Sequence, residues 1–305
     1  MPGTKPKLTL NWERTTSYQR TQLLKVTQLM ETGDYRAAAA HVDQLKVEKA
    51  LRVQLLAFIA TTVLKTERST GLSLFERALR ESTACWLRTD QLRTMGYIVQ
   101  CLSQSGLKPW AKTQVHQIMI GLASCAEVNP PTLPAGQQLA EACADLGFYL
   151  RRSGFRREAV RCFDTSLAAG KRFNPEDSEA YSRRMALFGY VAVKMAEAGL
   201  FKPALRLAHR IQSKTFNGLE YHNYELQRVE TLRRIASQLA GDRKKRRAKR
   251  VLKQAARIVI RDVHEMDQLR TNRLLELSTI LTEYGFPRQA RGISAAAQRI
   301  AKGTV

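Results

Sequence analysis

The sequence predicts an all-α protein, an α-solenoid built from about seven helical hairpins. The first observation is a repeated pattern in which a small residue, usually just after a polar turn, starts a run of small or apolar residues at helical spacing. Its copies begin at Ala38, Gly71, Ala111, Ala159, Ala204, Ala248 and Ala290. The successive steps are 33, 40, 48, 45, 44 and 42 residues, which is typical of stacked helical hairpins. The second observation is that no segment shows the alternation of apolar and polar residues that predicts a strand.

The N-terminal half is expected to form three hairpins followed by a break. Its first helix begins near Trp12 and is stopped by Gly33, and Asp34 can cap the second helix by accepting backbone N–H bonds. Three prolines lie within residues 129–134, and this segment is expected to be a loop because proline breaks a helix interior. The other helices of this half are expected at 37–45, 48–65, 69–81, 89–104 and 108–127.

The C-terminal half is expected to form four more hairpins. A helix start is predicted at residues 174–177, where Asn174 supplies a cap, Pro175 the first turn and two acids the favoured charge. The Asn217-Gly218 pair lies between helical patterns. The helices of this half are expected at 135–152, 155–170, 177–198, 201–214, 219–240, 243–264, 267–284 and 287–302. The predicted organisation is a frayed segment 1–10, a sub-array 11–128, the loop 129–134 and a basic sub-array 135–305.

The clearest copy of the pattern resembles the tetratricopeptide repeat. It places a small residue after Leu146, a large residue at Leu150, a turn at Gly154, and then Ala159 and Phe163 on the second helix. The segment 33–38 and the triplet Gly71, Phe75 and Ala78 also resemble the turn and second helix of that family. Weaker copies are Ala111, Val115, Ile118; Ala204, Ala208, Ile211; Ala248, Leu252, Ala255; and Ala290, Ser294, Ala297. Most steps exceed the 34 residues of the family, which indicates longer helices.

The resemblance implies a right-handed superhelix in which the first helix of each hairpin lines an inner groove and the second helix lies on the outer wall. Members of the family mostly bind proteins or peptides in that groove. A stacked array is typically a binding surface, so the resemblance favours binding over catalysis. The residues predicted to pack the repeat are Ala38, Gly71, Ala111, Gly147, Ala159, Phe163, Ala204, Ala248 and Ala290.

The chain of 305 residues is strongly basic, and most of the excess is C-terminal. Fifty Lys and Arg oppose 27 Asp and Glu, which gives +23, and residues 151–305 supply +18 of that total. Such an asymmetry indicates a polyanionic partner: nucleic acid, a membrane surface or an acidic protein. Many cations fall on second helices or their turns, including Arg77, Lys202 and Lys214. We therefore predict an electrostatic contact on the outer wall.

Residues 242–250 are the most basic segment, and they open a helix with an apolar face. Arg246, Arg250, Lys253 and Arg257 fall at i, i+4, i+7 and i+11, so they form one stripe of roughly 16 Å, long enough to meet several phosphates. Cations near a helix N-terminus oppose the macrodipole, which indicates that an anionic partner shaped the arrangement. The candidate residues for binding an anion or nucleic acid are Lys244, Lys245, Arg246, Arg247, Lys249, Arg250, Lys253, Arg257, Arg156, Arg157, Arg161, Arg206 and Arg210.

Three interpretations of this segment remain open: a solvated helix face, a contact with a phosphate backbone or acidic protein, and a nuclear-localisation patch if the source has a nucleus. No zinc-finger, RRM or KH motif is visible, and few aromatic residues accompany the segment, which argues against stacking of single-stranded bases. We rank first a non-enzymatic scaffold or adaptor that binds a protein or peptide, with the basic half contacting an acidic partner. A nucleic-acid-binding repeat protein ranks second, and a peptide-sensing regulator third.

Sequence motifs of catalysis and of metal or cofactor binding are absent. There is no GxxxxGK[ST], HExxH or GxSxG, no GxGxxG after a strand, and the five histidines lack metal-ligand spacing. We expect no enzyme activity, no cofactor and no metal. Trp12, Trp86 and Trp110 are interpreted as packing between hairpins or, alternatively, as a stacking platform. The cluster 221–224 is interpreted as helix packing or, alternatively, as part of a ligand pocket.

The sequence also bounds the cellular compartment. No stretch reaches the roughly 18 apolar residues of a membrane span, and the N-terminus lacks the apolar core of a signal peptide. The five cysteines show no CxxC spacing and are expected to be buried, reduced thiols: Cys85, Cys101, Cys125, Cys143 and Cys162. These features predict a cytoplasmic protein, or a nuclear one if the source is eukaryotic.

Overall fold

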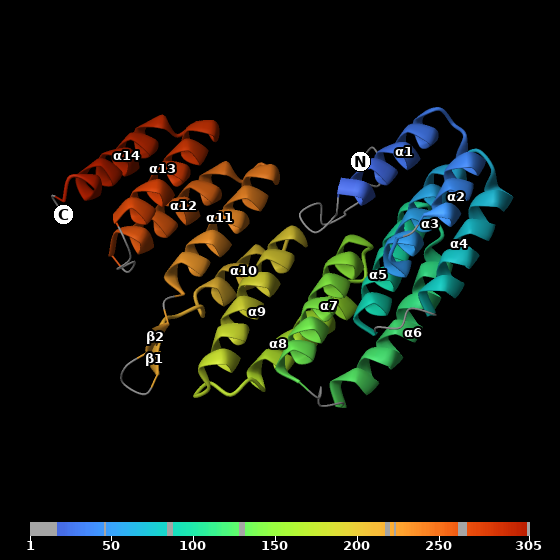
Figure 1. The fold of residues 1–305 in the computed structure, drawn as a ribbon, viewed down its shortest axis with the longest axis horizontal. Coiled ribbons are helices and arrows are strands. Elements are labelled where there is room, and N and C mark those ends of the chain that lie inside the picture. The colour runs from blue at the N-terminus through green and yellow to red at the C-terminus, as the bar shows by residue number, and fades with distance from the viewer. Residues whose placement is uncertain are drawn as a thin grey trace. The chain divides into compact units, whose positions relative to one another are not determined.

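The structure of the chain, a computed structural model, describes residues 17–45, 47–83, 88–127, 132–216, 220–222, 224–261 and 267–303. Those residues form fourteen α-helices and one two-stranded antiparallel ribbon (Figure 1). Backbone contacts divide the chain into two compact units. The first comprises Met1–Asn129 and Asp145–Cys162, and the second comprises Pro130–Ala144 and Phe163–Val305.

In the first unit, helices that follow one another in the sequence pack as antiparallel hairpins: α1 with α2, α3 with α4, and α5 with α6. Consecutive hairpins also touch, through α2 with α3 and through α5 with both α3 and α4. The helices are α1 (Ser17–Glu31), α2 (Tyr35–Gln44), α3 (Lys49–Val63), α4 (Arg68–Thr83), α5 (Arg88–Gln104) and α6 (Lys108–Glu127). The next pair, α7 (Leu133–Arg152) and α8 (Arg156–Lys171), is shared between the two units.

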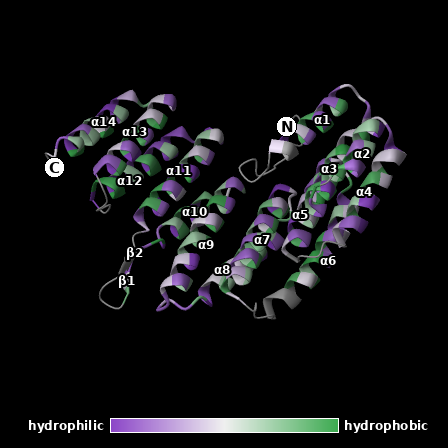
Figure 2. Ribbon diagram, viewed as in Figure 1, coloured by the Kyte–Doolittle hydropathy of each residue, from purple (hydrophilic) through white to green (hydrophobic). Residues whose placement is uncertain are grey.

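The second unit is also built from antiparallel hairpins, which are α9–α10, α11–α12 and α13–α14. Its elements are α9 (Ser178–Glu197), α10 (Phe201–Ala208), β1 (Lys214–Phe216), β2 (Glu220–His222), α11 (Glu225–Gly241), α12 (Lys245–Arg261), α13 (Asp267–Glu283) and α14 (Pro287–Ala301). Many helices are banded in hydrophobic and hydrophilic residues, as expected when one face is buried (Figure 2). The predicted fold class, an all-α array of helical hairpins, is confirmed.

Six of the described turns within hairpins share one geometry. One residue adopts the left-handed conformation, and the next residue donates its N–H to the carbonyl five positions earlier, as from Phe155 to Leu150 at 3.0 Å. Glycine suits this position because it has no Cβ. The left-handed residues are Gly33, Gly106, Gly154, Gly199, Arg243 and Gly285. Among the residues that the structure describes, Arg243 is thus the one left-handed residue that is not glycine.

The small residue of each sequence repeat occupies the same place in the first turn of a second helix. Its N–H donates to the carbonyl four residues earlier, for example from Ala159 to Phe155 at 3.0 Å and from Ala248 to Lys244 at 3.1 Å. All seven of these residues are buried, and so are Gly147 and Phe163. A Cβ on Gly71 would lie 2.7 Å from the Cα of Leu64, so the two helices of that hairpin meet backbone to backbone.

Aromatic packing joins neighbouring hairpins in the first unit. The ring of Phe75 on α4 meets that of Trp110 on α6 edge to face, with centroids 6.3 Å apart. Trp110 therefore packs between hairpins, which is the first of the two roles considered for it. Trp12 and Trp86 lie outside the described residues.

The structure corrects the expected helices around residues 201–240. Helix α10 ends at Ala208 and not near 214, and α11 begins at Glu225 and not at 219. Between them β1 and β2 pair with Thr215 opposite Tyr221. Phe216 is buried against Tyr181, with ring centroids 5.4 Å apart, and β-branched and aromatic residues favour the extended backbone found here. The Asn217-Gly218 pair lies outside the described residues.

Two helix starts also differ from the expectation, while a third agrees with it. Helix α9 starts at Ser178 after the cap Asp177, whose Oδ1 accepts from Ala180 N at 2.6 Å, so Pro175 precedes the helix. Helix α7 includes Pro134, which the first turn tolerates because its N–H has no helical partner. Asp34 caps α2 as predicted, accepting from Ala37 N at 3.0 Å. Residues 1–10 and 128–131 lie outside the described part.

Candidate anion-binding surface

Helix α12 separates apolar and basic residues more completely than the other helices of its unit. It carries eight Lys and Arg and no Asp or Glu. Its buried face is formed by Ala248, Val251, Leu252, Ala255, Ala256, Ile258 and Val259. The predicted stripe of Arg246, Arg250, Lys253 and Arg257 is exposed. Because the apolar face of α12 is buried, its basic face is exposed to solvent.

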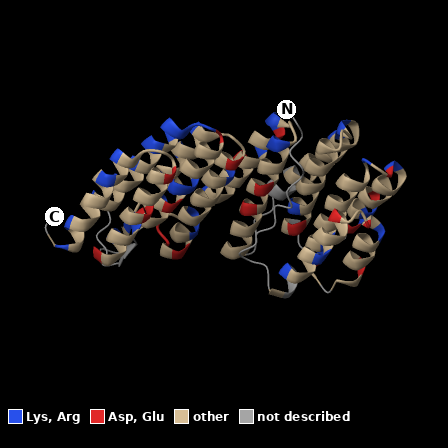
Figure 3. Ribbon diagram, turned by 90° about the horizontal axis from the view of Figure 1, so that it is seen from above, with Lys and Arg blue, Asp and Glu red and all other residues tan. Residues whose placement is uncertain are grey.

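The neighbouring second helices share this bias. Neither α10 nor α14 contains an acidic residue, whereas the first helices α9, α11 and α13 contain both signs. Several arginines of the first helices are ion-paired: Arg228 with Glu225 at 3.4 Å, Arg233 with Glu230 at 2.7 Å, and Arg273 with Glu276 at 2.9 Å. Figure 3 shows basic residues of the C-terminal helices gathered along one edge.

Seven cations of α10 and α12 have no such partner in the described part of the chain. Within the described ranges, no ion pair joins an acidic side chain to Lys202, Arg206, Arg246, Arg247, Arg250, Lys253 or Arg257. These exposed like charges raise the local positive potential, because no nearby carboxylate offsets it. The arrangement can attract and hold an anionic partner.

Two lysines of the predicted set instead cover aromatic rings. The Nζ of Lys244 lies 4.4 Å from the centroid of Phe201, and it also pairs with Asp242 at 3.1 Å. The Nζ of Lys249 lies 4.6 Å from the centroid of Phe286. Both contacts are within the range of cation–π attraction. Each lysine thus ties the α12 hairpin to the start of a neighbouring second helix.

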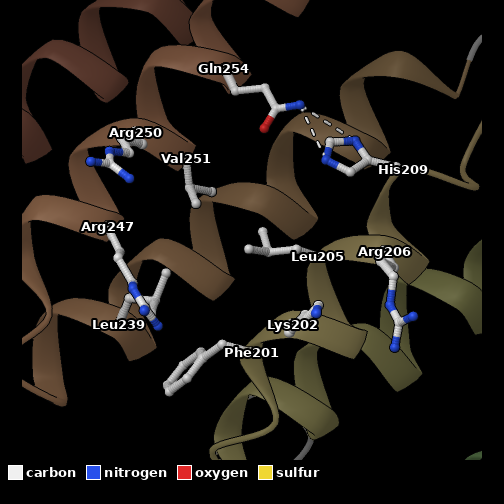
Figure 4. Close-up of a pocket in the computed structure, with 10 residues that line it drawn as sticks. All are labelled: Phe201, Lys202, Leu205, Arg206, His209, Leu239, Arg247, Arg250, Val251 and Gln254. Carbon is white, nitrogen blue, oxygen red and sulfur yellow. Dashed lines mark hydrogen bonds between the residues drawn. The ribbon is translucent and has the colours of Figure 1, made fainter.

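A pocket of about 480 Å³ lies between α10 and α12 (Figure 4). Leu205 lies near its centre, with Arg247 and Arg250 on one side and Arg206 on the other. Apolar side chains form its floor and cations surround them, and none of its lining residues is acidic. The lining residues are Phe201, Lys202, Leu205, Arg206, His209, Leu239, Arg247, Arg250, Val251 and Gln254.

His209 and Gln254 join the two walls of this pocket. The amide nitrogen of Gln254 lies 3.2 Å from Nε2 of His209, and a guanidinium nitrogen of Arg228 lies 3.2 Å from Nδ1. Burial lowers the pKa of His209, and the charge of Arg228 lowers it further. The lowered pKa favours the uncharged imidazole, which carries a proton on one ring nitrogen and accepts a hydrogen bond only at the other.

The remaining candidate residues fall into two groups. Arg210 is exposed just after α10, in the second unit. Arg156, Arg157 and Arg161 are exposed on α8 within the part assigned to the first unit. The structure thus brings three of the candidates, Arg206, Arg247 and Arg250, together around one pocket, and the α8 arginines are a separate set.

Two cations that the sequence assigned to the outer-wall contact instead pair with acidic side chains of this protein. Arg77 pairs with Asp43 and, at 3.0 Å, with Glu81. Lys214 lies on β1 and not on a helix, pairs with Glu176 at 2.8 Å, and donates to the carbonyl of Pro175 at 2.7 Å. These partners lie far away in the sequence, except for Glu81. Neither cation belongs to the unpaired set on α10 and α12.

Sequence reasoning missed the apolar residues of the pocket and Arg243. Phe201, Leu205 and Leu239 read as ordinary core positions, and only the approach of α10 to α12 shows that they also form a floor. One signal was present in the sequence: the turn before α12 lacks the glycine found at the matching place in the other turns of this type.

Other kinds of site find little support in the described part of the chain. It holds no group of three or more His, Cys, Asp or Glu side chains that could bind a metal ion. None of its helices is long and apolar enough to cross a membrane. Cys101, Cys143 and Cys162 are buried and form no disulfide, and Cys85 and Cys125 are not described at side-chain level. Tyr224 of the cluster 221–224 packs against Tyr181, with centroids 5.6 Å apart.

Comparison with known proteins relates the chain to solved structures only. No family model and no curated protein sequence matches it. The crystal structure of Ton1535 from Thermococcus onnurineus NA1 is similar over 91% of this chain and 75% of that one, with 13% identity and a TM-score of 0.50. A circular tandem repeat protein with novel repeat topology and enhanced subunit contact surfaces matches 92% of this chain and 62% of that one, with 14% identity and a TM-score of 0.37. At such identities the first match shows a shared fold alone.

Proposed function

We propose that this protein is a non-enzymatic helical-repeat scaffold, of the tetratricopeptide type, that binds an acidic protein through the second helices of its C-terminal hairpins. The observation that carries the proposal is the segregation of charge. Several arginines of the first helices, such as Arg228, Arg233 and Arg273, pair with acidic side chains of the protein, whereas α10 and α12 present cations without described acidic partners. Carboxylates of a bound protein would supply those partners and neutralise the local repulsion.

A nucleic acid is the second candidate, because the stripe on α12 could also follow a phosphate backbone. Two observations favour the protein partner. The rings of Phe201 and Phe286 beside α12 each have a lysine over one face, and Phe201 is largely buried, so these rings offer little surface for base stacking. The pocket between α10 and α12 has an apolar floor, which suits a protein side chain better than a phosphate. We place the protein in the reducing cytoplasm, in keeping with its buried cysteines that form no disulfide.

The test compares two variants that change the net charge equally. The stripe variant replaces Arg246, Arg250, Lys253 and Arg257 by Glu. The control variant replaces four exposed cations of the first unit by Glu: Lys65, Arg68, Lys108 and Lys112. Binding of poly-L-glutamate, single-stranded RNA and double-stranded DNA is measured at several salt concentrations for the wild type and both variants.

We expect the stripe variant to bind poly-L-glutamate at least about tenfold more weakly than the wild type, because it removes a localised contact. The control variant should keep the affinity of the wild type. Equal losses in both variants would mean that net charge alone acts, and would overturn the proposed surface. RNA or DNA binding that is tighter than poly-L-glutamate binding at about 150 mM salt would replace the protein partner by nucleic acid.

A further inference from the structure

We infer that the pocket between α10 and α12 seats a large apolar side chain of the acidic partner, while carboxylates flanking that side chain meet the cations at the rim. The inference rests on the proposed function and names the kind of segment that is bound: an acidic peptide stretch with an apolar residue at its centre. The cations of the site lie on the second helices α10 and α12, and the first helix α11 adds Leu239 to its floor.

The floor of the pocket supplies an apolar seat. Phe201, Leu239 and Val251 are 7%, 1% and 5% exposed, and Leu205 is half-buried at the centre. A volume of about 480 Å³ falls within the range of pockets that bind ligands. Burying an apolar group on this floor removes water from both surfaces, which a simple ion cannot do.

The rim supplies the complementary charge. Lys202 and Arg206 come from α10, and Arg247 and Arg250 come from α12, so the floor has cations on both sides. All four are exposed and have no described acidic partner. An arginine fork can bind a carboxylate through two parallel hydrogen bonds, which favours Asp and Glu beside the seated residue.

Ligands that are only charged or only apolar fit this pocket less well than an acidic segment that contains an apolar residue. A free phosphate would use the cations but leave the floor in water. A purely apolar segment would cover the floor, but it would also remove water from the rim cations without supplying hydrogen-bond acceptors in place of that water. This desolvation costs free energy. A segment that carries both features satisfies the floor and the rim together.

The end of the pocket at His209 and Gln254 is held in place before a ligand binds. His209 at the end of α10 is hydrogen-bonded to Gln254 of α12 and to Arg228 of α11, so three helices are joined there. The cation–π contact of Lys244 with Phe201 fixes the opposite end. A site held before binding loses less conformational entropy when the ligand arrives.

The experiment uses the full-length protein and two synthetic peptides. One is a 12-residue chain of Glu, Asp and Gly with a single central Phe, and its twin has Ser in place of Phe. We expect the Phe peptide to bind about tenfold or more tightly than the Ser peptide by fluorescence anisotropy, because a seated Phe buries apolar surface. Leu205→Ser should abolish this preference. Leu275→Ser, which removes a leucine that is 43% exposed on α13, should preserve it.

A second measurement reports the location of binding. With a photoreactive benzophenone at the Phe position, mass spectrometry should find crosslinks to residues 201–209 and 247–254. Crosslinks elsewhere, or equal binding of the two peptides, would overturn this inference and leave the proposed function standing. Failure of both peptides and of poly-L-glutamate to bind at about 50 mM salt would overturn the proposed function itself.

Discussion

Arg243 occupies, in the turn before α12, the left-handed backbone position that Gly285 occupies in the turn before α14. Their φ angles are +59° and +87°. The residue that follows each donates its N–H to a carbonyl five positions earlier, Lys244 to Leu239 and Phe286 to Leu281, both at 2.8 Å. A residue with a Cβ is disfavoured in this conformation by about 1–2 kcal/mol. Strain of this kind is often stored where function requires a particular side chain, and here it marks the start of the basic segment.

Replacing Arg243 by Gly should stabilise the protein. We expect the free energy of unfolding to rise by about 0.5–1 kcal/mol, since the relief of strain exceeds the extra entropy that glycine gives the unfolded chain. The reciprocal change Gly285→Arg should lower it by about 1 kcal/mol. Urea denaturation followed by circular dichroism measures both. A less stable Arg243→Gly protein would show that the turn is not strained.

Replacing Gly71 by Ala should destabilise the α3–α4 hairpin. The new Cβ would lie 2.7 Å from the Cα of Leu64, and backbone cannot move aside as a flexible side chain can. We expect a loss of roughly 1–3 kcal/mol in the free energy of unfolding, as for other overpacked cores. Gly292→Ala is the matched control, because no atom lies within 4 Å of its new Cβ and it is exposed on α14. That control should gain up to about 1 kcal/mol from helix propensity.

The helices and their turns could be predicted from the sequence because both depend on local information. Apolar residues at helical spacing predicted the buried faces of the helices, and Gly33 and Gly154 marked turns. The turn before α12 forms without glycine, so only the structure reveals its left-handed Arg243. Helix α10 was predicted too long, because the ribbon that replaces its end is stabilised by the packing of Phe216 against Tyr181, 35 residues earlier in the chain.

The candidate surface could be predicted only in part for the same reason. The basic stripe on α12 follows from periodicity within one helix. The pairing of Arg77 with Asp43 and of Lys214 with Glu176 depends on contacts 34 and 38 residues apart, which residue spacing does not encode. The pocket requires α10 and α12 to lie side by side, so its apolar floor has no local signature.

The stability of the protein should fall at alkaline pH through Cys101. Burial raises the pKa of this thiol to about 12, although the nearby hydroxyl groups of Thr61 and Tyr97 act in the opposite direction. Above pH 9 the unfolded chain releases a proton that the folded chain keeps, so the free energy of unfolding decreases as pH rises, by up to about 1.4 kcal/mol per pH unit. Urea denaturation at pH 8 and pH 10 measures this loss. In Cys101→Ala the loss should be smaller, and an unchanged pH dependence would contradict the assignment to Cys101.

The ion pair of Arg93 with Asp145 should stabilise the first unit more than the neighbouring pair of Arg93 with Asp90. Nε of Arg93 lies 2.9 Å from Oδ2 of Asp145, whose side chain is 12% exposed, whereas its contact with Asp90 is 3.8 Å long and more exposed. Asp145→Asn should therefore cost about 1–3 kcal/mol in the free energy of unfolding, because it removes the nearer and less exposed of the two carboxylates that pair with a half-buried guanidinium. Asp90→Asn should cost less than about 0.5 kcal/mol. In a double-mutant cycle, Arg93→Met combined with Asp145→Asn should cost less than the sum of the single changes, and simple additivity would show that the two side chains are not coupled.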